Sequence, residues 1–217
     1  MVYPTLHPTF SFLLGTVAAL FPIADPIGAI PIFYTFTAKH PPKYRRQQAK
    51  QIARNVFAVL VAFFLGGKFI LGFFGISLAV VRIAGGLIVA HTAWQMVTSH
   101  QRLTLQEHTE AIDKEDITLT PMAVPLISGP GAIGVTMTLS TRCQTWEEYL
   151  GCLLGIGLFS AVVYLCLFLG EPLVQKWGKT GVGALTRILG FLILAIAVQL
   201  IADGSLELVR ANLYQTR

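Results

Sequence analysis

The sequence has few charged residues and few cysteines, and it lacks the common catalytic motifs. Only 12% of its 217 residues are Asp, Glu, Lys or Arg, about half of the roughly 25% found in an ordinary soluble domain. The three cysteines form no C-x-x-C pair, and neither H-E-x-x-H nor G-x-S-x-G occurs. These absences argue against a disulfide, a thiolate metal site and a hydrolase. We therefore expect no enzyme, no catalytic residue, no metal site and no resident cofactor.

Apolar residues make up 54% of the chain, and its mean hydropathy is +0.65. Sorting the apolar stretches at a window of about 19 residues gives six candidate membrane spans. They are Phe10–Phe36, Val56–Phe74, Ile83–Val97, Leu119–Leu139, Tyr149–Leu169 and Val182–Ile201. The expected fold is all-α: a polytopic membrane protein of six transmembrane helices, with residues 1–217 forming a single membrane domain.

The net charge of +5 would suggest nucleic acid in a soluble protein, but here the basic residues lie mainly between apolar spans. We therefore expect the lipid bilayer as surroundings and no nucleic-acid partner. Ten basic residues occupy the loops after spans one, three and five, against three on the opposite side. The ten are Lys39, Lys43, Arg45, Arg46, Lys50, Arg54, Arg102, Lys114, Lys176 and Lys179, and the three are Arg142, Arg210 and Arg217. Because basic loops stay inside, both termini are predicted outside the cytoplasm, and residues 99–117 form a cytoplasmic connecting loop.

The two halves of the chain contain similar segments. Phe21–Ile30 matches Val124–Ile133 at an offset of 103 residues, and a stretch from Arg82 matches one from Arg187 at an offset of 105. Two segments with nearly one offset predict a repeat, with residues 9–98 as the first copy and 118–204 as the second. Because each copy has three spans, the second copy would insert in the membrane with inverted topology. Inverted repeats are typical of transporters. A duplicated scaffold without transport is the alternative.

Prolines and glycines gather near the middle of the first and fourth spans. Each proline removes a backbone donor and clashes with the preceding turn, so both helices are predicted to be broken. Asp25 followed by Pro26 has the pattern of an N-cap and a first-turn proline, and Ser128 and Gly129 precede Pro130 in the same way. The two helix N-termini would face the bilayer midplane and favour a small anion such as a carboxylate. Simple kinking of packed helices is the alternative.

Asp25 is the only acid predicted at mid-membrane depth, where a carboxylate is costly unless capped, paired or protonated. It is a candidate for binding a proton, Na⁺ or a substrate amino group, and a structural N-cap is the alternative. Gln95 and Gln199 lie at nearly equivalent places in the third and sixth spans and either line the cavity or link helices. The candidate substrate-binding residues are Asp25, Pro26, Gly28, Ala29, Ser128, Gly129, Pro130, Gly131, Gln95 and Gln199, and those for ion coupling are Asp25 and Thr136.

Five segments of the chain resemble the MarC family, also called the UPF0056 group, of bacterial inner-membrane proteins. They are Asp25–Phe33, Phe74–Ser77, Arg82–Leu87, Val124–Ile133 and Thr186–Gly190. The resemblance implies a SnatA-like transporter of small neutral amino acids in the bacterial inner membrane. The family usually has Asn where this chain has Asp25, and Ala where it has Ser128. An ionisable Asp25 favours coupling to a proton or another cation.

The expected function is therefore secondary transport of small neutral amino acids such as glycine or alanine, held between the two broken helices. Transport would be coupled to H⁺ or Na⁺ or would run as export. The alternatives are a non-transporting scaffold or regulatory membrane protein and, further off, an intramembrane enzyme. The expected partner is the small-molecule substrate, and a homo-oligomer is compatible with the sequence.

Overall fold

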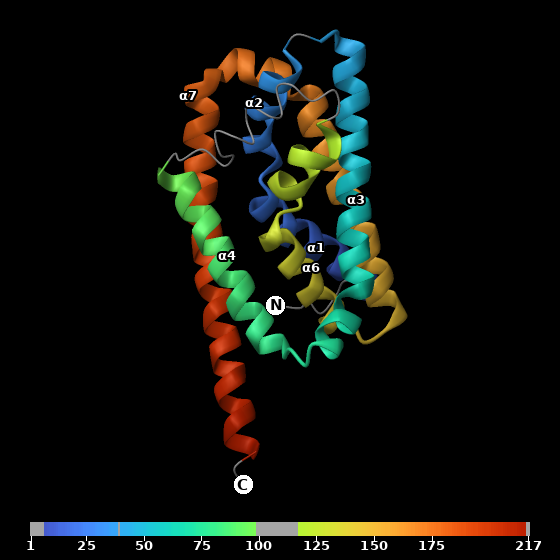
Figure 1. Ribbon diagram of the computed structural model, residues 1–217, viewed down its shortest axis with the longest axis vertical. Coiled ribbons are helices and arrows are strands. Elements are labelled where there is room, and N and C mark those ends of the chain that lie inside the picture. The colour runs from blue at the N-terminus through green and yellow to red at the C-terminus, as the bar shows by residue number, and fades with distance from the viewer. Residues whose placement is uncertain (1–6, 39, 99–116, 216–217) are drawn as a thin grey trace.

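The computed structural model describes residues 7–38, 40–98 and 117–215, and all of the regular structure in them is helical (Figure 1). The helices are α1 (Pro8–Ala24), α2 (Pro26–Thr37), α3 (Pro42–Phe73), α4 (Leu78–Thr98), η1 (Thr118–Ile127), α6 (Pro130–Arg142) and α7 (Trp146–Gln215). Most of the predicted connecting loop, 99–116, lies outside the described residues. The prediction of an all-α membrane protein is confirmed.

Four helical segments are long and apolar enough to cross a bilayer singly: α3, α4 and two stretches of α7, Trp146–Gly170 and Gly183–Ala211. Two further spans arise if each bent pair counts as one. α1 and α2 meet at a bend of 50°, and η1 and α6 meet at a bend of 68°. The six predicted spans thus correspond to four continuous segments and two broken ones, and the breaks fall in the first and fourth as predicted.

α3 begins 14 residues before the span predicted to start at Val56, because hydropathy detects only its apolar part. Its 32 residues would extend about 48 Å, well beyond the roughly 30 Å of a hydrocarbon core. Pro42 occupies the first turn, where its missing N–H costs nothing. The basic N-terminal turns of α3 therefore continue the helix beyond its apolar part.

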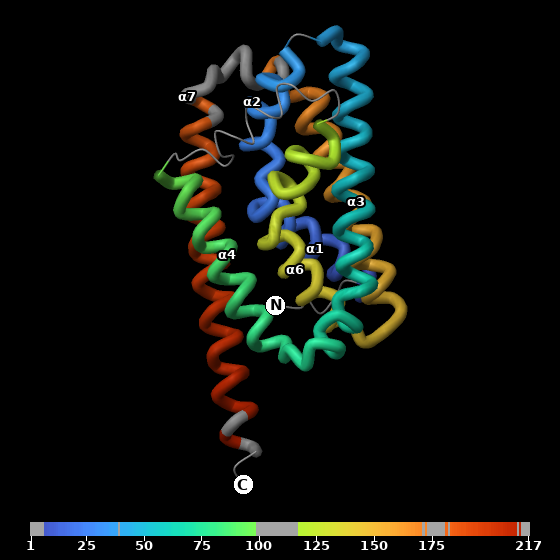
Figure 2. Tube along the Cα trace, viewed as in Figure 1, coloured from blue at the N-terminus to red at the C-terminus, as the bar shows by residue number. Residues whose placement is uncertain are grey.

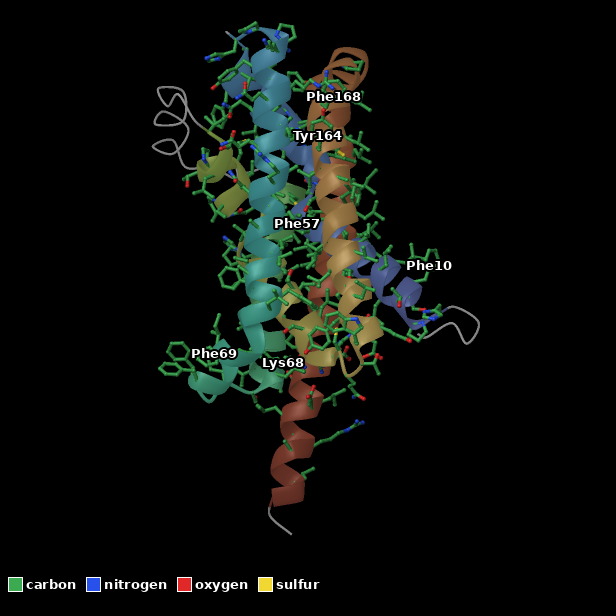
Figure 3. The ribbon with its side chains drawn as sticks, turned by 90° about the vertical axis from the view of Figure 1, so that its right-hand side faces the viewer. Phe10, Phe57, Lys68, Phe69, Tyr164 and Phe168 are labelled. Carbon is green, nitrogen blue, oxygen red and sulfur yellow. The ribbon has the colours of Figure 1, made fainter. Side chains whose placement is uncertain are left out.

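The helices run up and down the bundle (Figures 1 and 3). Phe10, near the start of α1, lies at about mid-height in Figure 3, and α7 ends at the bottom. The first apolar stretch of α7 lies beside α3, and the second runs the opposite way beside α4 (Figures 1 and 2).

Small residues let α4 and the second stretch of α7 pack closely. Gly86 faces Ala197 and Ile201, so that a Cβ built on it would lie 3.0 Å from the Ala197 carbonyl oxygen and 2.7 Å from Ile201 Cγ1. Gly190 in turn faces Met96 and the Ala93 carbonyl. Because lipid offers no hydrophobic drive for helices to associate, such close contact supplies the packing energy.

Two neighbouring glycines test this packing. A methyl group at Gly85 would meet nothing within 4 Å, whereas one at Gly86 would press on backbone atoms of α7. We expect Gly86→Ala to destabilise the protein by about 1–3 kcal/mol, and Gly85→Ala to be neutral or stabilising because alanine is the better helix former. Thermal unfolding in detergent measures both, and equal stabilities would contradict the packing.

Candidate functional site

The first helix break is centred on Asp25, whose side chain is fully buried. Its backbone adopts left-handed angles, φ 41° and ψ 67°, which non-glycine residues rarely do and which Asp and Asn tolerate best. Its N–H donates to the Phe21 carbonyl at the end of α1, and its carbonyl accepts from Ala29 N–H in α2. One residue thus ends the first helix and begins the second.

The Asp25 carboxylate caps α2 as predicted: Oδ1 accepts a hydrogen bond from Gly28 N–H at 3.0 Å. Pro26 follows in the first turn, where a proline is tolerated. Gly28 is required by this geometry, because a Cβ built on it would lie 2.1 Å from Asp25 Oδ2. The carboxylate therefore lies directly over the first turn of α2.

The second break has a different construction. Thr120 and Val124 have extended backbone angles inside η1, and each precedes a proline, which disfavours the helical region for the residue before it. The predicted helix start at Ser128, Gly129 and Pro130 is confirmed, but no side chain caps it. The N-cap is Gly129, which has no side chain to do so, and Ser128 instead donates its own N–H to the Ala123 carbonyl at 2.7 Å.

The Ser128 hydroxyl is fully buried and has no hydrogen-bond partner among the described residues. After Ser128, Ile133 N–H donates a hydrogen bond to the Gly129 carbonyl, which is the first carbonyl that α6 uses. The start of α6 therefore combines an uncapped N-terminus with an unpaired buried hydroxyl. Buried polar groups are nearly always paired, so this one requires an explanation.

The two breaks lie next to each other in the interior. A Cβ built on Gly131, in the first turn of α6, would lie 3.3 Å from Ile23 Cγ2 in α1 and 2.9 Å from Val89 Cγ2 in α4. Ile23 is two residues before Asp25, and Gly131 is three residues after Ser128. Both α1 and α4 thus pack against the first turn of α6. The sequence repeat did not predict that Val89 lies beside Gly131.

The remaining predicted residues lie elsewhere or are already bonded. Thr136 is buried, and its hydroxyl donates to the Ala132 carbonyl of its own helix at 2.7 Å. The Gln95 amide bonds to His91 on the same helix at 2.9 Å, and Gln199 is exposed on the surface. A role for the two glutamines in the substrate site therefore stays a prediction.

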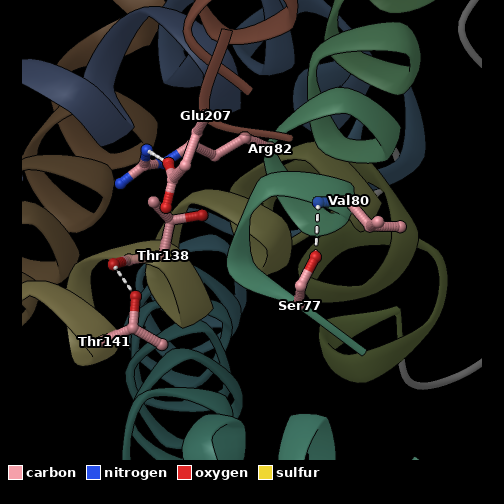
Figure 4. A network of polar contacts seen from close by, with 6 residues as sticks. All are labelled: Ser77, Val80, Arg82, Thr138, Thr141 and Glu207. Atoms are coloured by element: carbon pink, nitrogen blue, oxygen red, sulfur yellow. Dashed lines mark hydrogen bonds and ion pairs between the residues drawn. The ribbon is translucent and has the colours of Figure 1, made fainter. Parts of the chain in front are cut away.

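Two basic residues at the edges of the predicted spans, Lys68 and Arg82, are bonded to groups of neighbouring helices. Lys68 Nζ donates to the Cys143 carbonyl at 3.1 Å and to the Tyr149 hydroxyl. Arg82 forms an ion pair with Glu207 that ties α4 to α7 (Figure 4). Within the described ranges no group of three His, Cys, Asp or Glu residues would hold a metal ion.

A family model described as MarC family integral membrane protein matches residues 10–209. The chain belongs to the MarC family. It is 35% identical over 207 residues to a UPF0056 membrane protein of Buchnera aphidicola subsp. Schizaphis graminum, which covers 94% of this chain and 97% of that relative. It is 33% identical over 199 residues to the UPF0056 membrane protein YvbG of Bacillus subtilis, covering 90% and 94% of the two chains.

An archaeal relative is equally similar to this MarC protein. A UPF0056 membrane protein of Methanocaldococcus jannaschii is 36% identical over 195 residues, covering 89% of this chain and 95% of that relative. No solved structure matches the chain. The relatives' names describe membrane proteins and state no substrate, so the chemistry of the helix breaks carries the functional argument.

Two substitutions of Asp25 separate its cap from its charge. Asn keeps an oxygen for Gly28 N–H and tolerates the left-handed backbone, whereas Ala does neither. We expect Asp25→Asn to fold with near-normal stability and Asp25→Ala to lose about 1–2 kcal/mol. Thermal unfolding in detergent compares them, with Asp203→Asn, an exposed acid of α7, as the control for charge removal. An alanine variant as stable as the asparagine variant would show that the cap is unimportant.

Proposed function

We propose that this MarC protein is a secondary transporter of small neutral amino acids such as glycine or alanine, bound between its two helix breaks. The observation that carries the proposal is the second break, where the fully buried, unpartnered Ser128 hydroxyl stands at the uncapped start of α6. Helix N-termini bind carboxylates through free amides and a partial positive charge. A substrate carboxylate would also accept a hydrogen bond from the Ser128 hydroxyl.

The first break would supply the complementary charge. The Asp25 carboxylate is buried and uses Oδ1 for the Gly28 amide. A second carboxylate oxygen can accept further hydrogen bonds, as from a substrate ammonium. A proton or Na⁺ bound at Asp25 would instead couple transport to an ion gradient. Thr136, in α6 beyond its first turn, is the second candidate residue for this coupling. An amino acid is a zwitterion, so its ammonium would fit the negatively charged first break and its carboxylate the positive helix end at the second.

The packing around Gly131 supports a small substrate. Ile23 and Val89 already touch the position where a glycine Cβ would lie, so little room exists without movement of α1 or α4. We propose that the two predicted inverted repeats, 9–98 and 118–204, exchange conformations to open the site to each side in turn. The basic loops would place the protein in the bacterial inner membrane with both termini periplasmic.

Substrate flux in proteoliposomes tests the proposal. Purified protein should move labelled glycine or alanine, under an imposed proton or Na⁺ gradient or by exchange. Ser128→Ala should weaken apparent substrate affinity about tenfold, the effect of losing one buried hydrogen bond. The same variant should be at least as stable as the wild type, because it removes an unsatisfied buried hydroxyl.

Gly131→Leu should abolish flux by filling the space beside Ile23 and Val89, and Gly15→Leu is its matched control, since a Cβ at Gly15 meets nothing within 4 Å. Ligand-induced thermal stabilisation by the same amino acids gives a second readout. Absence of both flux and stabilisation in folded wild-type protein would instead favour a scaffold or regulatory role. Unchanged affinity in Ser128→Ala would remove the second break from the substrate site.

A further inference from the structure

A second candidate site lies between the N-terminal half of α3 and the first stretch of α7, and no residue of the two helix breaks lines it. A cavity of about 700 Å³ opens there, within the size range of small-molecule sites. Its lining residues are Lys43, Arg46, Gln47, Lys50, Ala53, Arg54, Phe57, Gly157, Ser160, Ala161 and Tyr164. None of these residues belongs to the proposed transport site, so the two sites can be tested separately.

The outer part of this cavity is strongly basic. Lys43, Arg46, Lys50 and Arg54 lie three or four positions apart on α3, so they share one face of the helix. All four are exposed, no acidic residue lines the cavity, and none of the four forms an ion pair in the described part of the chain. Four uncompensated positive charges in one opening attract an anion.

The inner part of the cavity is apolar. Ala53 and Phe57 continue the same face of α3, and Gly157 and Ala161 face them from α7. A Cβ built on Gly157 would lie 3.7 Å from Phe57 Cε2, which makes Gly157 part of the cavity wall. Figure 3 shows Phe57 below Tyr164 and Phe168 on the side of the molecule where α3 and α7 run together.

The change from basic to apolar follows the depth of the membrane. Lys43 and Phe57 are 14 residues apart, about 21 Å along the helix. The basic residues belong to the turns of α3 that precede the predicted span at Val56, and Phe57 lies inside it. Tyr164 and Phe168 stack with ring centroids 5.6 Å apart, and the Arg46 guanidinium lies 5.4 Å from the Phe168 centroid. Aromatic and basic side chains together are typical of the interface.

We propose that this cavity binds an anionic phospholipid from the cytoplasmic leaflet. The phosphate lies among Arg46, Lys50 and Arg54, and an acyl chain follows Phe57 and Gly157 toward the bilayer centre. A phospholipid is the ligand that carries a phosphate and a long apolar chain at this spacing, and basic pockets between transmembrane helices bind such head groups. A soluble anion would leave the apolar half of the cavity unfilled.

Bound lipid would connect α3 to the first stretch of α7. The described hydrogen bond that joins these helices, from Lys68 to Tyr149, lies near the other end of α3. The lipid would therefore hold the basic end of the pair together and make stability depend on lipid composition.

Lipid binding can be measured on the full-length protein purified in detergent. Added phosphatidylglycerol should raise the thermal unfolding temperature at low ionic strength, and native mass spectrometry should detect one retained phospholipid. The triple variant Arg46→Gln, Lys50→Gln, Arg54→Gln should bind roughly a hundredfold more weakly, since each basic residue near the surface contributes about fivefold. Arg142→Gln with Arg210→Gln, two exposed basic residues of the opposite end, should bind normally.

A second variant tests the acyl-chain half without changing charge. Gly157→Leu should fill the groove beside Phe57 and reduce phosphatidylglycerol binding, whereas Gly15→Leu, which faces open space, should not. Equal stabilisation by phosphatidylcholine would overturn the requirement for an anionic lipid. Equal stabilisation by inorganic phosphate, with Gly157→Leu binding as wild type, would replace the lipid with a soluble anion. Wild-type affinity in the folded triple variant would exclude the cavity altogether.

Discussion

Within a bilayer every backbone N–H and C=O needs a partner, and this requirement governs the two helix breaks. At the first break Asp25 satisfies it alone: its carboxylate, N–H and carbonyl all bond to neighbouring helix ends. At the second break no side chain does so, because Gly129 caps α6 and Ser128 bonds through its backbone only. The halves therefore share a bent shape but differ in which polar groups remain available.

That difference gives the two breaks separate chemical roles. A helix end whose amides are capped by a carboxylate has little capacity for another anion, whereas the uncapped α6 retains its positive end. Asp25 contributes negative charge, and the start of α6 contributes donors and a buried hydroxyl. A ligand with one group of each sign would satisfy both breaks together, which is why we favour a zwitterionic substrate.

The sequence predicted the helical class, the two broken spans and the Asp25 cap because each depends on local chemistry: apolar length, proline geometry and a short polar side chain. It could not predict contacts that depend on how helices rotate and cross. Gln95 and Gln199 occupy similar sequence positions, yet Gln95 bonds to His91 of its own helix and Gln199 is exposed. Val89 contacts the position of Gly131 although no motif marks it. Cys143 and Cys152, whose sulfur atoms lie 3.6 Å apart, likewise meet only through the turn between α6 and α7. The inverted repeat stays a prediction.

The charges of this protein differ in their surroundings between the interior and the basic end of α3. In the interior the buried Asp25 carboxylate accepts a hydrogen bond from the Gly28 backbone amide. At the interface, positive charges on α3 are exposed and uncompensated by any acid of the cavity. The same row of Lys and Arg that predicts orientation therefore also forms a surface that lipid phosphate complements. Orientation needs only the number of charges, whereas a binding site needs them on one helix face above an apolar groove, which α3 and α7 provide.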